Sequence, residues 1–461
     1  MYRKKILFLV LSGAIIFIFL FTRFYDLENR YSFDHDQEAA ADAAWKFIVD
    51  KKPMLIGQET SVGGLFVGPF LWWFQAIAMA LGKMNPISLA YLGSLVSLIT
   101  LILIFFTVKD ISNKWQGLIA GYLYTISPRL LSYDMSSSAI SYIMLFSILI
   151  YYLLVKIIGN RKYYLLPILA FTLSATFHIH FTLILLLPAV LIIFILKRPK
   201  IHIKYFISSA IAFLMPLVTF LIFDLRHGFL IANKLKIFSS QKSFSLHKLF
   251  NTTLIYVDVL MDSISINTKL NIFILLMIIL GFIYLVRNKK NILIFSLILL
   301  LIPLIALWFY SGHISEYYFL PIVPIFLIIT SFLGFYIFQK NAAFFLLLVL
   351  VIGLFNFTKL KNSFINHLPL SYKEEVINMI IADSNNNDFN VYYQMPSGID
   401  KGYRYIFKWK KRIPKDGSNL LYILEYNSPD KFEPVNYYKT FIAKDIKIQS
   451  IGPLYLIAVK L

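Results

Sequence analysis

RKKILFLVLSGAIIFIFLFTRFYD, residues 3–26, places an apolar run from Ile6 to Phe21 directly behind three cations. The run approaches the length that a helix needs to cross a bilayer. The same layout occurs in secretory signal peptides, but no small-residue cleavage site follows Phe21. We therefore interpret the stretch as a retained signal anchor.

Apolar runs of similar length recur along the chain. They lie at 87–108, 115–131, 138–155, 163–177, 181–196, 205–223, 271–286, 291–309, 319–338 and 342–357, and with the run at 5–22 they make about eleven spans. The composition agrees, with 59% hydrophobic residues, 15% charged residues and a mean hydropathy of +0.71. An ordinary soluble protein is excluded. The sequence predicts an all-α polytopic membrane protein with about eleven transmembrane helices.

The net charge of +20 raises the question of a nucleic-acid partner. The lysines and arginines stand in short clusters between apolar runs and form no single basic face, so we expect no nucleic-acid binding. Cysteine is absent. This excludes a disulfide framework, a thiolate metal site and a cysteine nucleophile.

The basic clusters predict the topology. They lie in alternate connections: Arg3-Lys4-Lys5, Lys109 with Lys114, Lys156 with Arg161 and Lys162, Lys197-Arg198-Pro199-Lys200 with Lys204, Arg287 with Lys289 and Lys290, and Lys340. By the positive-inside rule these connections face the cytoplasm. The N-terminus is then cytoplasmic, and an odd number of spans places the C-terminal residues outside the cell membrane.

Residues 65–82 are apolar for about the minimum length of a span. If they crossed, the strongly basic connection at 197–204 would lie outside. The Trp72-Trp73 pair is typical of the headgroup level, and Pro69 precedes it. We therefore expect this helix to lie along the outer interface without crossing.

The chain becomes polar after Asn356. We expect a transmembrane domain over 1–357, with an acidic first outer loop at 23–64, and a small extracytoplasmic α/β domain over 358–461. Ser371-Tyr372-Lys373-Glu374 reads as a capping box that opens a helix to about Ile381. Strands are expected at 391–393, 420–424 and 454–459.

The first outer loop carries FDHDQEAA, residues 33–40, with three carboxylates at the start of an expected helix. Two readings fit. Asp34 can cap the helix while Asp36 and Glu38 favour its positive end, or one carboxylate can act as a general base beside the membrane. Both readings can hold for different residues.

Several stretches together resemble the bacterial glycosyltransferase family 39 type of the GT-C superfamily, which also contains protein O-mannosyltransferases and lipid A aminoarabinose transferases. They are RFYDLENRYSFDHDQEAAADAAWKFI (23–48), LIGQETSVGGLFVGPFLWWF (55–74), GYLYTISPRLLSYDMSS (121–137), FHIHFT (177–182), IFDLRHGF (222–229) and EYYFLPIVP (316–324). The resemblance covers the membrane portion through about residue 340. Its strongest parts are the acidic loop and the SVGGLFVGP segment.

The resemblance implies a transferase that moves a sugar from a polyprenyl-phosphate donor to a hydroxyl of a protein or glycolipid on the outer face of the membrane. An acidic residue of the first outer loop would serve as base, which corresponds best to Asp36, with Asp34 and Glu38 as neighbours. The family pattern is close to Asp-Glu, whereas this chain has Asp36-Gln37-Glu38. The assignment therefore stays open between Asp36 and Asp34, and a divalent cation stays an open question.

A leaving lipid phosphate gains negative charge and needs a cation beside it. Arg226, His227 and Arg129 are the candidates, because each is expected near the outer end of a span, although an arginine there can also snorkel to the interface. A substrate groove could use His178, His180, Tyr317 and Tyr318. An i, i+2 histidine pair shares no helical face, which argues against both histidines coordinating one ion. An aromatic belt would explain the tyrosines equally well.

Two other classes compete with a transferase. A transporter or flippase should carry ionisable groups near the bilayer midplane, broken helices and an inverted repeat, but the expected spans contain few charges. A membrane-anchored assembly protein would have outer loops without a convergent site, and replacement of its acidic loop would change nothing.

Overall fold

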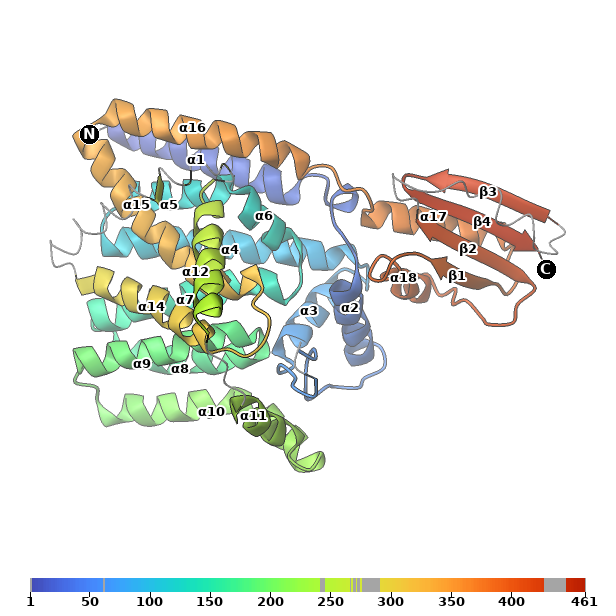
Figure 1. Ribbon diagram of the computed structural model, residues 1–461, viewed down its shortest axis with the longest axis horizontal. Coiled ribbons are helices and arrows are strands. Elements are labelled where there is room, and N and C mark those ends of the chain that lie inside the picture. The colour runs from blue at the N-terminus through green and yellow to red at the C-terminus, as the bar shows by residue number, and fades with distance from the viewer. Residues whose placement is uncertain are drawn as a thin grey trace. The chain divides into compact units, whose positions relative to one another are not determined.

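The computed structural model describes residues 2–60, 63–240, 245–265, 267, 271, 274–275, 291–426 and 445–460 (Figure 1). The chain forms two compact units. The helical unit comprises Met1–Tyr25, Met54–Trp72 and Gly93–Asn362, and the sheet unit comprises Asp26–Pro53, Trp73–Leu92 and Ser363–Leu461. Residues 26–53 and 73–92 therefore group with the C-terminal residues.

The helices up to Asn362 largely follow the apolar runs. They are α1 (Tyr2–Phe24), α2 (His35–Ile48), α3 (Phe70–Leu81), α4 (Ile87–Ile111), α5 (Lys114–Ile126), α6 (Pro128–Met135), α7 (Ala139–Leu154), α8 (Leu166–Ala175), α9 (Leu186–Lys197), α10 (Ile203–Arg226), α11 (Leu230–Ser240), α12 (Leu246–Asp262), α14 (Asn291–Trp308), α15 (Val323–Lys340) and α16 (Ala342–Asn362). Short 3-10 or π-helical turns extend several of them.

Six helical segments among the described residues are long and apolar enough to cross a membrane. They are Tyr2–Phe24, Ile87–Ile111, Ala139–Gly159, Ile203–Arg226, Glu316–Lys340 and Ala342–Asn362. Four shorter apolar helices accompany them, at Phe70–Leu81, Tyr163–His178, Phe181–Lys197 and Ile294–Trp308. The protein is a multi-pass membrane protein, but the expected number of about eleven spans is not confirmed. The expected span at 271–286 and the cluster Arg287, Lys289 and Lys290 lie largely outside the described residues.

The expected span at 115–131 is wrong as a continuous helix. Ser127 has an extended backbone conformation, and its hydroxyl accepts the N–H of Leu130 at 3.3 Å, which caps a new helix. Pro128 suits the first position of that helix because it has no N–H to satisfy. The break leaves α5 with 13 residues, about 20 Å at 1.5 Å per residue.

Helices α11 and α12 were not predicted. Polar and charged residues interrupt their apolar residues, so neither stretch contains a long hydrophobic run. The helices that were predicted differ in what surrounds them. The segment containing α15 is largely buried among other helices, whereas α10 exposes apolar side chains along its length. Such a surface on α10 fits contact with lipid.

The sheet unit holds a four-stranded sheet in the order β1-β2-β4-β3 (Figure 1). Its strands are β1 (Asn390–Gln394), β2 (Leu420–Tyr426), β3 (Asp445–Ile451) and β4 (Leu454–Lys460), accompanied by α17 (Leu370–Asp383) and α18 (Tyr403–Trp409). Strands β1 and β2 run parallel, and the other pairs are antiparallel. The expected small α/β fold is confirmed, with β3 and α18 as additions.

The helix expected from the capping box begins earlier than predicted. Pro369 precedes its first residue, Leu370, so Ser371 lies inside the first turn and does not cap the helix. This position turns Lys373 toward the interior, where it is fully buried. The segment before α2 contacts this helix through the Leu370 N–H, which donates to the Tyr31 carbonyl at 2.8 Å.

Candidate functional site

The expected site residues fall in both compact units. In the sheet unit, α2 begins at His35, and Asp34 is its N-cap. The Gln37 side chain accepts the N–H of Asp34 at 3.1 Å, which completes a capping box. One Asp34 oxygen also accepts a hydrogen bond from Lys373 Nζ at 2.8 Å. Burial lowers the pKa of Lys373, and the Asp34 carboxylate opposes that shift.

Glu38 caps a second helix. Its Oε1 accepts the backbone N–H of Tyr405 at 3.0 Å, in the first turn of α18. One turn further along α2, Asp42 pairs with Lys408 at 2.8 Å. Carboxylates are favoured at the N-terminus of a helix, where backbone N–H groups lack partners. Glu38 therefore has a structural task that its sequence position did not reveal.

Asp36 lies in the first turn of α2 and is partly exposed. Of the two acidic residues in this turn, Asp36 is partly exposed and Glu38 is buried.

In the helical unit, Arg129 of α6 forms an ion pair with Glu316. Tyr133 donates its hydroxyl to Glu316 Oε1 at 3.1 Å. Asp262 interacts electrostatically with both charged residues, and burial raises its pKa while Arg129 opposes the rise. The positive charge of Arg129 is therefore already matched by a carboxylate. Sequence reasoning missed Glu316, although it directly precedes the tyrosine pair expected in the groove.

Three of the four expected groove residues come together. The His180 ring packs edge-on against Tyr317 and Tyr318, with ring centroids 5.6 and 6.1 Å away. Burial lowers the pKa of His180 to about 4, so its imidazole is neutral at pH 7. The Thr182 N–H donates to His180 Nδ1 at 3.3 Å, which leaves the ring proton on Nε2.

His178 lies apart from this aromatic group. It is fully buried, and its ring stacks on Phe70 with centroids 3.9 Å apart. A Cβ on Gly68 would come within 1.9 Å of His178 Nδ1, and the Gly68 N–H donates to the Phe177 carbonyl at 3.0 Å. His178 therefore holds the LFVGP segment in place, and a glycine is required where the two meet.

Arg226 and His227 are exposed at the end of α10. The His227 ring stacks on Phe223, with centroids 4.1 Å apart. Asp224 accepts the N–H groups of Ile231 and Ala232 at 2.8 and 3.0 Å, so it caps α11. No hydrogen bond or ion pair joins Arg226 to another residue in the described part of the chain.

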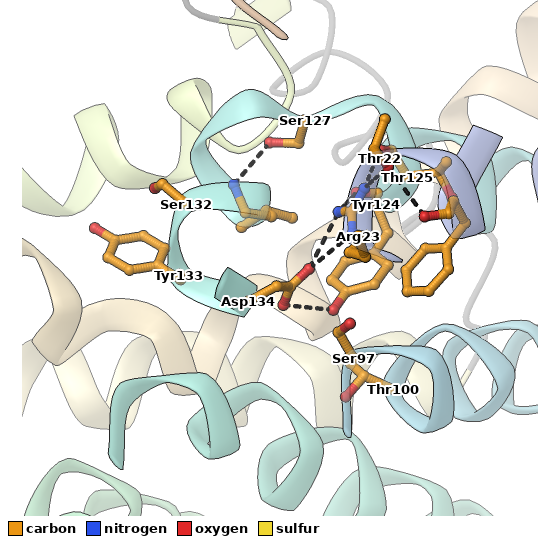
Figure 2. Close-up of polar contacts among 12 residues, drawn as sticks. Thr22, Arg23, Ser97, Thr100, Tyr124, Thr125, Ser127, Ser132, Tyr133 and Asp134 are labelled. Atoms are coloured by element: carbon orange, nitrogen blue, oxygen red, sulfur yellow. Dashed lines mark hydrogen bonds and ion pairs between the residues drawn. The ribbon is translucent and has the colours of Figure 1, made fainter. Parts of the chain in front are cut away.

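A buried ionic network was not predicted (Figure 2). Arg23, at the end of α1, reaches Asp134 of α6 at 3.1 Å, and neither side chain has exposed surface. Tyr124 donates to the other Asp134 oxygen at 2.8 Å, and Arg23 donates to the Thr125 carbonyl at 2.7 Å. Burial raises the pKa of Asp134 to about 6, and Arg23 and Tyr124 oppose that rise. The carboxylate is therefore ionised at pH 7 beside its partner.

No group of three or more histidine, aspartate or glutamate side chains is placed to hold a metal ion in the described ranges. The carboxylates of the first turn of α2 are instead engaged one by one in protein contacts, as Asp34 and Glu38 illustrate.

The model of the family described as dolichyl-phosphate-mannose-protein mannosyltransferase matches residues 67–223. The crystal structure of ArnT from Cupriavidus metallidurans bound to undecaprenyl phosphate superposes with a TM-score of 0.62, at 8% identity, over 98% of both chains. The resemblance to GT-C glycosyltransferases of the family 39 type is confirmed. The apo state of the same ArnT gives a TM-score of 0.63 at 10% identity, over 100% of this chain and 98% of the other.

The GT-C fold is shared more widely. The archaeal oligosaccharyltransferase AglB from Archaeoglobus fulgidus, in complex with an inhibitory peptide and a dolichol-phosphate, gives a TM-score of 0.56 at 11% identity. The likeness covers 90% of this chain and 65% of AglB. Comparison with curated protein sequences finds no significant match. At these identities the solved structures show the fold, and the family match adds a resemblance to a mannosyltransferase family over residues 67–223.

Proposed function

We propose that the chain transfers a sugar from a polyprenyl-phosphate donor to a hydroxyl of a protein or glycolipid acceptor on the outer face of the membrane. One observation carries the proposal. Asp36 is a partly exposed acidic residue in the first turn of α2, in a chain that shares its fold over nearly its whole length with an ArnT bound to undecaprenyl phosphate. Asp36 is the proposed base for the acceptor hydroxyl.

The donor phosphate needs a cation, and the two arginines differ in what they can offer. Arg129 is paired with Glu316, whereas Arg226 is exposed at the end of α10. A phosphate would have to displace Glu316 to reach Arg129. We therefore place the donor phosphate at Arg226, with His227 beside it, and the sugar or lipid carrier along His180, Tyr317 and Tyr318.

Mass spectrometry of glycolipids and glycoproteins from cells with and without the chain tests the proposal. We expect one product class to lose a single hexose or pentose when the chain is removed, and to regain it when the chain is restored. Restoration with Asp36→Asn should not recover the product. Identical glycan profiles in all three cells would contradict the proposed transfer.

Arg226→Ala should raise the KM for the donor about 10-fold or more, because a hydrogen bond to a charged group contributes about 1.5–3 kcal/mol. Arg226→Lys keeps the charge but loses the planar fork of donors. Its KM for the donor should therefore fall between those of the unaltered chain and Arg226→Ala. Steady-state transfer by the purified protein measures both. Unchanged donor dependence in Arg226→Ala would mean that this arginine contacts lipid headgroups and not the donor.

The proposed orientation predicts that the connection after α3 lies outside the cell membrane. Helix α3 has 12 residues, about 18 Å at 1.5 Å per residue, which is shorter than a bilayer core of about 30 Å. The absence of native cysteine makes a single-cysteine test direct. An impermeant thiol reagent added outside should label Lys83→Cys and should not label Lys200→Cys. Labelling of Lys83→Cys only from the cytoplasmic side would overturn the topology.

A further inference from the structure

Lys373 is a buried cation that joins three segments of the sheet unit. Its Nζ donates to the Phe33 carbonyl at 2.8 Å, to Asp34 Oδ1 at 2.8 Å and to the Lys401 carbonyl at 2.9 Å. An ammonium has three N–H donors, so all of its hydrogen bonds are made within the protein. These acceptors lie just before α2 and just before α18, while Lys373 itself belongs to α17.

The residues that Lys373 contacts near α2 lie directly before the acidic turn, which is the first turn of α2 with Asp36 and Glu38. Phe33 and Asp34 immediately precede α2, and Asp36 is the second residue of that helix. The direction of the first turn of α2 therefore depends on where Lys373 holds the Phe33 carbonyl and the Asp34 side chain. Because the ammonium is buried, water cannot readily replace it there.

A second set of contacts holds the same helix from α18, which packs beside α2 (Figure 1). Glu38 binds the Tyr405 N–H, and Asp42 pairs with Lys408. Gly402, which precedes α18, has a φ of +93°, and a Cβ at this position would come within 2.1 Å of the Phe33 carbonyl oxygen. The backbone that enters α18 at Gly402 therefore passes close to the carbonyl that Lys373 binds.

We propose that Lys373 is a positioning residue for the acidic turn, so that the C-terminal α17 and α18 set the place of Asp36 toward its substrate. The importance of that placement rests on the proposed function. The positioning itself is a property of the sheet unit and can be measured without turnover. A residue with a merely structural role would instead stabilise the whole unit without a specific effect on the first turn of α2.

Site-directed spin labelling of the full-length, otherwise cysteine-free chain tests this. A nitroxide at His35→Cys, an exposed position next to Asp36, reports the mobility of the acidic turn. A second nitroxide at Asn378→Cys, exposed on α17, reports whether the unit as a whole is intact. We expect Lys373→Met and Asp34→Ala to mobilise the label at 35 and leave the label at 378 unchanged.

The matched control is Lys410→Met. Lys410 lies 3.9 Å from Glu374 of α17, and among the described residues no hydrogen bond or ion pair joins it to the start of α2. The variant should therefore leave both labels unchanged. With turnover as the second measurement, Lys373→Met and Asp34→Ala should lower kcat about 10-fold or more, because misplacement of a catalytic group slows chemistry. The KM for the polyprenyl-phosphate sugar should stay within about 2-fold of the unaltered chain.

The two measurements separate failure of this inference from failure of the proposed function. If Lys373→Met mobilises both labels, Asp34→Ala becomes the test of the positioning role. That variant removes one hydrogen-bond partner of the same ammonium. An unchanged label at 35 in Asp34→Ala, or an equal gain of mobility at 378, would overturn the positioning role. If the unaltered chain transfers no sugar, the proposed function fails, and the label mobilities still decide whether Lys373 positions the turn.

Discussion

Asp36→Asn should express and bind donor normally and lose about 10²- to 10⁴-fold in transfer rate, which is the usual contribution of a positioned general base. The amide cannot take a proton from the acceptor hydroxyl. The substitution is nearly isosteric, so the helix should persist. Single-turnover transfer and donor binding by the purified variant measure the two effects separately.

Asp34→Asn is the matched control for Asp36→Asn. Asparagine can still cap a helix, and its carbonyl oxygen can still accept from Lys373. The variant should therefore keep most of the transfer activity. If Asp34→Asn is inactive and Asp36→Asn retains activity, the two carboxylates have been assigned the wrong way round.

Arg23→Met should lower the free energy of unfolding by about 3–5 kcal/mol, because removal of one partner from a buried ion pair leaves the other charge uncompensated. Asp134 would keep only Tyr124 among the partners it has now. Equilibrium unfolding of the purified protein in detergent measures the change. Arg226→Met is the matched control, since it removes an exposed arginine at the end of another helix, and it should cost about 0.5 kcal/mol or less.

The double variant Arg23→Met with Asp134→Leu distinguishes the ion pair from simple packing. It removes both charges, and buried ion pairs can often be replaced by apolar residues without loss of stability. We therefore expect it to be more stable than Arg23→Met alone, which is non-additivity of the kind that contacting residues show. Equal stability of Arg23→Met and Arg226→Met would mean that the pair contributes little.

Hydrophobic periodicity and composition were enough to predict the membrane class and the positions of the long helices. The runs at 87–108, 205–223 and 342–357 correspond to α4, α10 and α16, because a segment that faces lipid must carry its apolar character in its own residues. The strands β1, β2 and β4 were likewise visible as short runs of β-branched, aromatic and leucine residues. Hydropathy alone does not show the interruption of the run at 115–131. The signal for it is Pro128, because proline is favoured at the first position of a helix.

The roles of individual site residues were much harder to predict. Asp34, Asp36 and Glu38 look equivalent in FDHDQEAA, yet Asp34 contacts Lys373 and Glu38 contacts Tyr405. His178 and His180 stand two positions apart, and they pack in different surroundings. The contact partners come from segments that are distant in the chain, so no local pattern announces them.

The sequence by itself thus determined what depends on neighbouring residues: which segments are apolar enough for lipid, where charge clusters, and which stretches favour helix or strand. Tertiary structure alone decided which charges meet. Arg23 reads locally as the polar flank of a span and Asp134 as a loop carboxylate, yet the fold buries them together. The physical reason is that hydropathy is a local property summed along the chain, whereas desolvation and pairing depend on residues brought together from distant segments.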